Sequence, residues 1–307
     1  MEVEASLTPW LLTGLGGVFG WGISKSPPPT TFALAGRTRP DAWPDAPGVR
    51  LDLANPGEFS AVLEQLHPSV VIHAACLSRA QDCEDHPDLV NQVNVAAVQE
   101  WLQTSSTWDS FPLYISTEQV FDGTRSSYAE DALTSPLSAY GKSKAAAEEL
   151  VLAAGGAVVR LPLLLGPEIG NGRAGADSAI LQAVRAGQRP RLFHDEIRTP
   201  VHPALLGPGL WRIAQGRVPG IFHLAGAEAV SRLELGQRCC EEAGLPASFD
   251  AVSAKDFDGP PRSLNLVLEC GRAQRELGWK APNLRQSLAW TTPPAVVAES
   301  VPQSEEA

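Results

Sequence analysis

The sequence predicts an α/β fold in which a doubly wound parallel sheet is followed by a smaller C-terminal lobe. Short apolar runs alternate with helical patterns through the first half of the chain, which is typical of repeated βα units. A glycine-rich turn follows the first apolar run, and the second half has fewer apolar runs and more proline and glycine. With 307 residues, the chain can form one large domain or two modest ones around a sizeable core.

The first half, residues 1–165, contains five predicted strands with helices between them. Strands that are buried on both faces of a parallel sheet give continuous apolar runs, and the runs here are of that kind. The strands are predicted at 9–13, 31–35, 69–73, 112–116 and 157–161, and the helices at 17–24, 56–66, 89–105 and 140–154.

The second half, residues 166–292, is predicted to form the smaller lobe, with part of its chain returning to the main sheet. A loop at 166–172 opens it. Residues 293–307 are rich in Pro, Ser and Glu, which predicts a disordered tail. Within the lobe, helices are predicted at 176–186, 204–214 and 232–243, a strand at 221–224, and a short apolar stretch at 190–193.

Composition and charge argue against several classes of function. A net charge of -11, with a pI near 5.0, gives no attraction to nucleic acid or to an anionic membrane, so a small molecule or a protein is the expected partner. No apolar run approaches the roughly 20 residues that span a bilayer. The first residues lack the basic start of a secretory signal, so we expect a cytoplasmic protein. The five cysteines and six histidines show no metal-ligand spacing, and no metal site is expected.

The segment 13–20, Thr-Gly-Leu-Gly-Gly-Val-Phe-Gly, lies between the first predicted strand and the first predicted helix. Glycines at 14, 17 and 20 suit a tight turn, a close approach of the backbone to a pyrophosphate, and close packing of helix on strand. We interpret the segment as a dinucleotide-binding turn. The alternative is a glycine-rich βα turn without a ligand.

Two arginines follow the second predicted strand, where an NAD-binding protein usually places an acidic residue for the ribose hydroxyl. Arg37 and Arg39 instead suit a 2′-phosphate by charge and by bidentate geometry, which favours NADPH or NADP over NAD(H). The alternative is that both arginines only keep a loop soluble. A short third strand at 51–53 would place Asp52 beside the adenine.

Tyr140 and Lys144 lie four residues apart and therefore share one face of the predicted helix 140–154. A nearby cation stabilises a phenolate and brings its pKa toward the working pH, so the pair suits proton transfer to or from a substrate oxygen. Because this spacing also occurs by chance on solvated helices, the pair gains weight only from the motifs that accompany it.

Together these motifs resemble the extended short-chain dehydrogenase/reductase family, and within it the dTDP-4-dehydrorhamnose reductase group. The matching stretches lie at 14–20, 71–76, 93–94, 115–123 and 138–144. The fourth reads Ile-Ser-Thr-Glu-Gln-Val-Phe-Asp-Gly and departs from the usual pattern of the group at Glu118 and Gln119. The resemblance implies a Rossmann fold over the first 165 residues, a nicotinamide cofactor and a C-terminal lobe that binds substrate, and it leaves a homodimer open.

The resemblance implies that Thr117, Tyr140 and Lys144 are the catalytic residues. NADPH would deliver a hydride to a ketone carbon while Tyr140 supplies the proton, and Thr117 would orient the carbonyl oxygen. Lys144 would hold the nicotinamide ribose and lower the pKa of Tyr140. Asn94 is expected in a supporting position. The remaining cofactor contacts are expected from Gly14, Leu15, Gly17, Val18, Phe19, Leu53, Ala74, Ala75 and Cys76.

The substrate-binding residues expected from the resemblance are Glu118, Gln119, Leu163 and Arg198. Glu118-Gln119 replaces an Asp-Tyr pair, and the aliphatic segment 160–165 lacks a tryptophan that packs on the sugar in the group. Both departures concern which substrate is bound. Arg198 or Arg262 could grip a diphosphate, and the alternative is that each is an ion-paired or surface arginine.

The activity implied is reduction of a keto group on a nucleotide sugar, with NADPH as the cofactor. A nucleotide-sugar epimerase or dehydratase would use the same tyrosine and lysine. The missing acid after the second strand disfavours the epimerase, and Gln119, where a dehydratase usually has a second acid, disfavours the dehydratase. A third interpretation is a non-catalytic NADP-binding regulatory protein, like the beta subunit of methionine adenosyltransferase, which resembles the same reductases.

Overall fold

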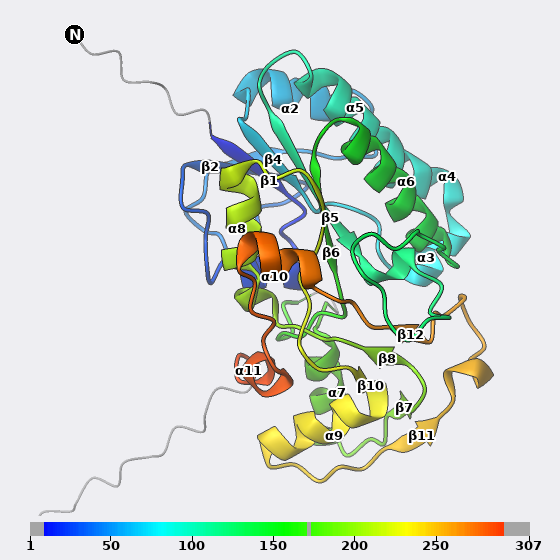
Figure 1. Ribbon diagram of the computed structural model, residues 1–307. Helices are drawn as coiled ribbons and strands as arrows, with labels where there is room; N and C mark the ends of the chain where they lie inside the picture. Colours follow the sequence, from blue (N-terminus) through cyan, green and yellow to red (C-terminus); the bar gives the residue numbers. More distant parts are fainter. Residues whose placement is uncertain (1–8, 171–172, 292–307) are drawn as a thin grey trace, which may run out of the picture.

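A seven-stranded parallel sheet organises the protein (Figure 1). The computed structural model describes residues 9–170 and 173–291, so the tail predicted at 293–307 lies outside the described residues. The strands run in the order β3-β2-β1-β4-β5-β6-β9, and all neighbours are parallel. They are β1 (Trp10–Thr13), β2 (Phe32–Gly36), β3 (Gly48–Arg50), β4 (Val70–His73), β5 (Phe111–Thr117), β6 (Ala157–Leu161) and β9 (Gly220–His223).

The five strands predicted in the first half are confirmed, and their ends differ from the prediction by at most one residue. The direction of winding reverses between β1 and β4, so the chain leaves these neighbouring strands toward opposite sides of the sheet. A doubly wound sheet binds its ligands at such a reversal, outside the carboxyl ends of the strands.

The short strand predicted at 51–53 is wrong in position, because β3 ends before it at Arg50. The Leu51 amide still donates to the Gly36 carbonyl at 3.0 Å. The Asp52 carboxylate then accepts from the Ala54 amide at 3.2 Å and turns the chain away from the sheet. Asp52 therefore lies just beyond the strand instead of within it.

Helices cover both faces of the sheet (Figure 1). Alternate strand residues point to opposite faces: Leu11 packs in a cluster with Phe59 and Trp101, whereas Leu12 packs in a cluster with Ile23 and Trp211. The first cluster lies under α2 (Glu58–Leu66), α5 (Ala97–Ser105) and α6 (Ala139–Ala153), and the second under α1 (Val18–Ile23), α8 (Gly207–Gly216) and α10 (Gly271–Leu277).

The helix predicted at 89–105 is interrupted. It consists of α4 (Pro87–Asn91), a π-helical turn (Gln92–Ala96) and α5, and it is preceded by the unpredicted α3 (Ala80–Asp85). A π-turn inserts one extra residue into a helix and re-aims the side chains beside it, often at functional sites. Here the turn carries Asn94.

The C-terminal lobe contains two small sheets and two longer helices beside the carboxyl end of β6 (Figure 1). The α9 helix matches its predicted range because Ser231 and Glu234 form a capping box at its start and Gly244, with φ +64°, ends it. The lobe contains α7 (Ala176–Arg185), α9 (Arg232–Ala243), α11 (Leu284–Leu288), the sheet β10-β8-β12 (Val230–Ser231, Ile197–Arg198, Asn265–Leu266) and the pair β11-β7 (Asp250–Val252, Arg191–Phe193). Short 3-10 turns lie at Glu118–Val120, Pro203–Leu205 and Ala254–Asp256.

Three histidines are buried in the fold. His73 ends β4, where its Nδ1 lies 2.8 Å from the Thr13 hydroxyl. Burial lowers the pKa of His73 to about 3 and that of His202 to about 4. Burial and the charge of Arg160 together lower the pKa of His223 to about 3. All three side chains are therefore neutral at physiological pH.

These histidines predict that the protein loses stability as the pH falls below about 6.5. The unfolded chain binds protons from about pH 6.5, the ordinary histidine pKa, whereas the folded chain binds them only near pH 3–4. Each histidine therefore removes about 1.4 kcal/mol per pH unit within that window. Two carboxyl groups act in the opposite direction against the three histidines: burial raises the pKa of Glu118 to about 8, and it also raises the pKa of Asp177.

Urea unfolding at about pH 7.5, 6 and 5 measures this dependence, because ordinary histidines change charge between these values. A His73→Gln variant should show a shallower loss of unfolding free energy, and a variant of the exposed His86 should show the wild-type slope. A free energy of unfolding that does not fall over this range would contradict the assignment of three neutral histidines.

Candidate dinucleotide and catalytic site

The glycine-rich turn between β1 and α1 lines a cavity of about 1000 Å³ at the carboxyl ends of the central strands. Gly14 has φ +76°, and a Cβ there would lie 2.2 Å from the Ala75 backbone nitrogen, so only glycine fits. At Gly17 a Cβ would meet nothing within 4 Å. The turn is therefore packed tightly against the end of β4 while its backbone at Gly17 stays open to a ligand.

Every residue that the sequence predicts for cofactor binding lines this cavity, although their binding role stays a prediction. The glycine turn, the segments that follow β2, β3 and β4, and the start of α6 supply them. They are Gly14, Leu15, Gly17, Val18, Phe19, Arg37, Arg39, Asp52, Leu53, Ala74, Ala75, Cys76, Tyr140 and Lys144, and Thr117 lines the cavity with them.

The cavity is positively charged, in contrast to the acidic chain as a whole. Its lining includes six cationic residues and two acidic ones, whereas the net charge of the chain is -11. Such a lining attracts a polyanion with several phosphates. The cationic residues are Arg37, Arg39, Arg50, Arg79, Lys144 and Arg173, and the acidic ones are Asp52 and Asp82.

The three predicted catalytic residues meet at one end of the cavity. Thr117 ends β5 and lines the cavity together with Tyr140. Tyr140 lies in the first turn of α6, whose start is capped by the Ser138 hydroxyl accepting from the Gly141 amide at 3.1 Å. Lys144, one turn later, donates from Nζ to the Ile115 carbonyl at 2.6 Å.

Burial raises the pKa of Tyr140 well above its ordinary value; Cys76 acts in the same direction, and Thr117 opposes it. Burial also lowers the pKa of Lys144. The predicted lowering of the tyrosine pKa by Lys144 is therefore wrong for this structure. The reason is that burial dominates and that the ammonium points to the Ile115 carbonyl and lies 3.9 Å from the centre of the Tyr114 ring. A phenol that retains its proton suits a proton donor.

Asn94 supports this arrangement from the π-helical turn. Its Nδ2 donates to the Leu77 carbonyl at 3.0 Å and to the Ser143 hydroxyl at 2.9 Å, and its Oδ1 accepts from the Leu77 amide at 2.8 Å. The side chain thereby ties the loop after β4 to α6, between Tyr140 and Lys144. This agrees with the supporting position expected from the sequence.

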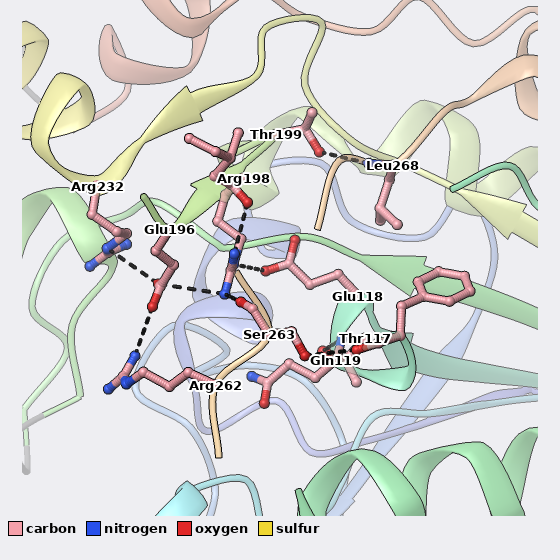
Figure 2. A network of polar contacts seen from close by, with 12 residues as sticks. Thr117, Glu118, Gln119, Glu196, Arg198, Thr199, Arg232, Arg262, Ser263 and Leu268 are labelled. Atoms are coloured by element: carbon pink, nitrogen blue, oxygen red, sulfur yellow. Dashed lines mark hydrogen bonds and ion pairs between the residues drawn. The ribbon is translucent and has the colours of Figure 1, made fainter. Parts of the chain in front are cut away.

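Two predicted substrate residues, Glu118 and Arg198, pair with each other and do not line the cavity (Figure 2). Arg198 Nε lies 2.9 Å from Glu118 Oε1, and both side chains are buried. The remaining guanidinium nitrogens donate to the carbonyls of Ile197, Ser263 and Leu264 at 2.7–2.9 Å. With Nη2 also 3.5 Å from Glu196 Oε1, each N–H group of Arg198 has a partner within the protein, and substrate binding by Arg198 and Glu118 stays a prediction.

The ion pairs continue from Arg198 to the buried Glu196 (Figure 2). Arg262 lies 3.0 Å and Arg232 4.0 Å from its carboxylate oxygens. The Arg262 guanidinium also lies 4.3 Å from the centre of the Phe257 ring. Arg198 and Arg262 are thus both ion-paired, as the alternative interpretation of the sequence held. Burial raises the pKa of Glu118 to about 8, although Arg198 opposes the shift.

The other two predicted substrate residues also lie outside the cavity lining. Gln119 is half-buried, and its backbone amide donates to the Thr117 hydroxyl at 3.2 Å. Leu163 packs against the apolar cluster of the C-terminal lobe. An aliphatic wall is present as expected, but Leu161, Pro162 and Leu164 form it instead of Leu163.

Arg173 is among the cavity residues that the sequence did not predict, because its partner is distant in the chain. Arg173 Nη1 donates to the Gly16 carbonyl, 157 positions away, at 2.6 Å. A single arginine in a loop carries no motif, and only the folded chain reveals the contact.

Within the two described ranges, no group of His, Cys, Asp or Glu side chains is arranged to hold a metal ion. None of the helices in these ranges has the length and apolar character needed to span a bilayer.

The sheet order, the glycine turn and the meeting of Thr117, Tyr140 and Lys144 define a Rossmann protein of the extended short-chain dehydrogenase/reductase class. The family described as RmlD substrate binding domain matches residues 9–294, and the chain belongs to this family.

Individual relatives include both a subunit of methionine adenosyltransferase and reductases. Methionine adenosyltransferase 2 subunit beta of Bos taurus is 27% identical over 277 residues, which cover 86% of this chain and 81% of that protein. A probable low-salt glycan biosynthesis reductase of Haloferax volcanii is 26% identical over 251 residues, covering 80% and 84%. The structure of dTDP-4-dehydrorhamnose reductase from Bacillus anthracis, in complex with NADP, has a TM-score of 0.79 at 21% identity and covers 92% of this chain and 97% of that one.

Proposed function

We propose that the protein is an NADPH-dependent reductase of a keto group on a nucleotide sugar. The observation that carries the proposal is the meeting of Thr117, Tyr140 and Lys144 at one end of a cationic cavity whose other parts are formed by the glycine turn and the end of β2. Membership of the RmlD family and the likeness to a reductase in complex with NADP support it.

The residues present fit a phosphorylated dinucleotide. Gly14 and Gly17 leave the turn backbone open for a pyrophosphate, and Arg37, exposed at the end of β2, suits a 2′-phosphate. Ala74 and Ala75 add little bulk to the lining after β4. When bound, the nicotinamide supplies a hydride for the carbonyl carbon.

The protein's own groups would deliver the proton and orient the carbonyl. In the proposed reaction, the Thr117 hydroxyl and the Tyr140 phenol hydrogen-bond to the substrate oxygen, and the phenol transfers its proton there as negative charge develops. Lys144, which lines the same cavity, would hold the cofactor ribose.

A second candidate is a regulatory protein that binds NADP without turning over a ketone. Two observations favour it: the likeness to the methionine adenosyltransferase beta subunit over 86% of this chain, and the engagement of Arg198 with Glu118. An arginine that is fully used within the protein cannot also hold a substrate phosphate.

A panel of nucleotide-linked keto sugars, incubated with NADPH and followed by the loss of nicotinamide absorbance, separates the candidates. We expect at least one keto sugar to be reduced. NADPH binding is measured in parallel by fluorescence. Binding without turnover across the panel would reject the reductase and favour the regulatory protein, and absence of binding would reject both.

A further inference from the structure

We propose that Arg173 binds the pyrophosphate of the dinucleotide, so that the C-terminal half of the chain completes the cofactor site. The inference rests on the proposed cofactor but not on catalysis. It assigns the charged partner of the pyrophosphate to a residue outside the glycine turn and outside the first 165 residues.

The position of Arg173 is set by contacts on both sides. Its Nη1 donates to the Gly16 carbonyl at 2.6 Å, and a Cβ at Gly16 would lie 3.3 Å from the same nitrogen. On its own side, the Arg173 backbone amide donates to the Gly170 carbonyl at 3.1 Å, and its carbonyl accepts from the Ile169 amide at 2.9 Å. The guanidinium is thus held over the turn from an anchored backbone.

The glycine turn lacks a charge of its own. Segment 13–20 contains no ionisable side chain, so the turn offers a pyrophosphate only backbone N–H groups. A guanidinium presents five donors in one plane, and one of them is used on the Gly16 carbonyl. Charge-assisted hydrogen bonds from the others to phosphate oxygens would supply the attraction that the turn cannot.

The distribution of cations around the cavity gives each anionic part of the ligand a separate partner. Arg37 and Arg39 follow β2, where a 2′-phosphate is expected, and Lys144 lies beside the catalytic tyrosine. Of the six cations that line the cavity, Arg173 alone hydrogen-bonds to the glycine turn within the described residues. A pyrophosphate lying on the turn would therefore meet Arg173.

The contact with Gly16 also allows a purely structural role, in which Arg173 only ties a loop to the turn. Binding constants for three ligands distinguish the two roles. NADPH contains a pyrophosphate and a 2′-phosphate, NADH contains the pyrophosphate alone, and adenosine 2′-phosphate contains the 2′-phosphate alone. Arg173→Gln and Arg37→Gln form a matched pair of variants, since each removes one cavity guanidinium.

Arg173→Gln should weaken NADPH and NADH by the same factor, about tenfold to a hundredfold, and leave adenosine 2′-phosphate unchanged. Arg37→Gln should weaken NADPH and adenosine 2′-phosphate and leave NADH unchanged. Unchanged NADPH binding in Arg173→Gln, or an equal loss for all three ligands, would overturn the inference. A wild-type protein that binds neither dinucleotide would reject the proposed cofactor and the inference with it.

Discussion

Replacing Tyr140 by phenylalanine should lower the rate of keto reduction by about 10²–10⁴-fold and leave NADPH binding nearly unchanged. The substitution removes the phenol that would donate the proton and keeps a ring of almost the same shape in the buried cluster with Cys83 and Val90. Single-turnover oxidation of NADPH measures the chemical step, and fluorescence titration measures cofactor binding.

Tyr114→Phe is the control for this substitution. Tyr114 is also buried, and its hydroxyl has no hydrogen-bond partner among the described residues, while its ring face toward Lys144 is kept. Its reduction rate should stay close to the wild-type rate. Substantial activity in Tyr140→Phe would remove Tyr140 from the proposed mechanism.

Replacing Arg160 by methionine should destabilise the fold by about 3–5 kcal/mol, because it leaves the Glu148 carboxylate buried without its partner. The two side chains are 2% and 3% exposed, and Arg160 Nη2 lies 2.7 Å from Glu148 Oε2. Arg160 belongs to β6, and Glu148 lies in α6, one turn after Lys144. The pair therefore joins the helix that carries the catalytic side chains to the sheet. Urea unfolding measures the loss.

Two further variants test whether burial is the cause. The double variant Glu148→Gln with Arg160→Met leaves no unpaired charge and should recover part of the loss. Arg50→Met breaks an exposed pair, with side chains 66% and 31% exposed, and should cost at most about 1 kcal/mol. Equal losses of unfolding free energy in Arg160→Met and Arg50→Met would show that burial does not make the Arg160–Glu148 pair more costly to break.

The parts of the site that the sequence predicted are those set by short-range patterns. The glycine turn is local, since Gly14 must adopt a positive φ within a single βα connection. Tyr140 and Lys144 share one helix face, and their spacing together with the neighbouring motifs predicts that they lie at one site. The five strands predicted in the first half follow similarly from apolar runs that are buried in the sheet, whereas β3 is largely exposed and gives no such run.

The parts that escaped prediction depend on partners far apart in the chain. Glu118 meets Arg198 only because β8 lies against the turn after β5, and Arg173 meets Gly16 across 157 positions. The strand predicted at 51–53 failed for a local reason, since the apolar pattern continues through Leu51 while the Asp52 carboxylate turns the chain. Whether the pKa of Tyr140 is raised or lowered depends on the burial of its side chain, which cannot be inferred from the spacing of residues in the sequence.

The place of β9 in the main sheet limits how the chain can be divided. β9 pairs with β6 from Ala157 to Arg160, although residues 162–219 separate the two strands. A fragment that ends at residue 165 would leave β6, an entirely buried strand, as a bare apolar edge of the kind that recruits other chains into aggregates. During synthesis, β9 emerges only after the lobe that precedes it in the chain. The outer edge of β6 therefore stays unpaired until β9 has been made.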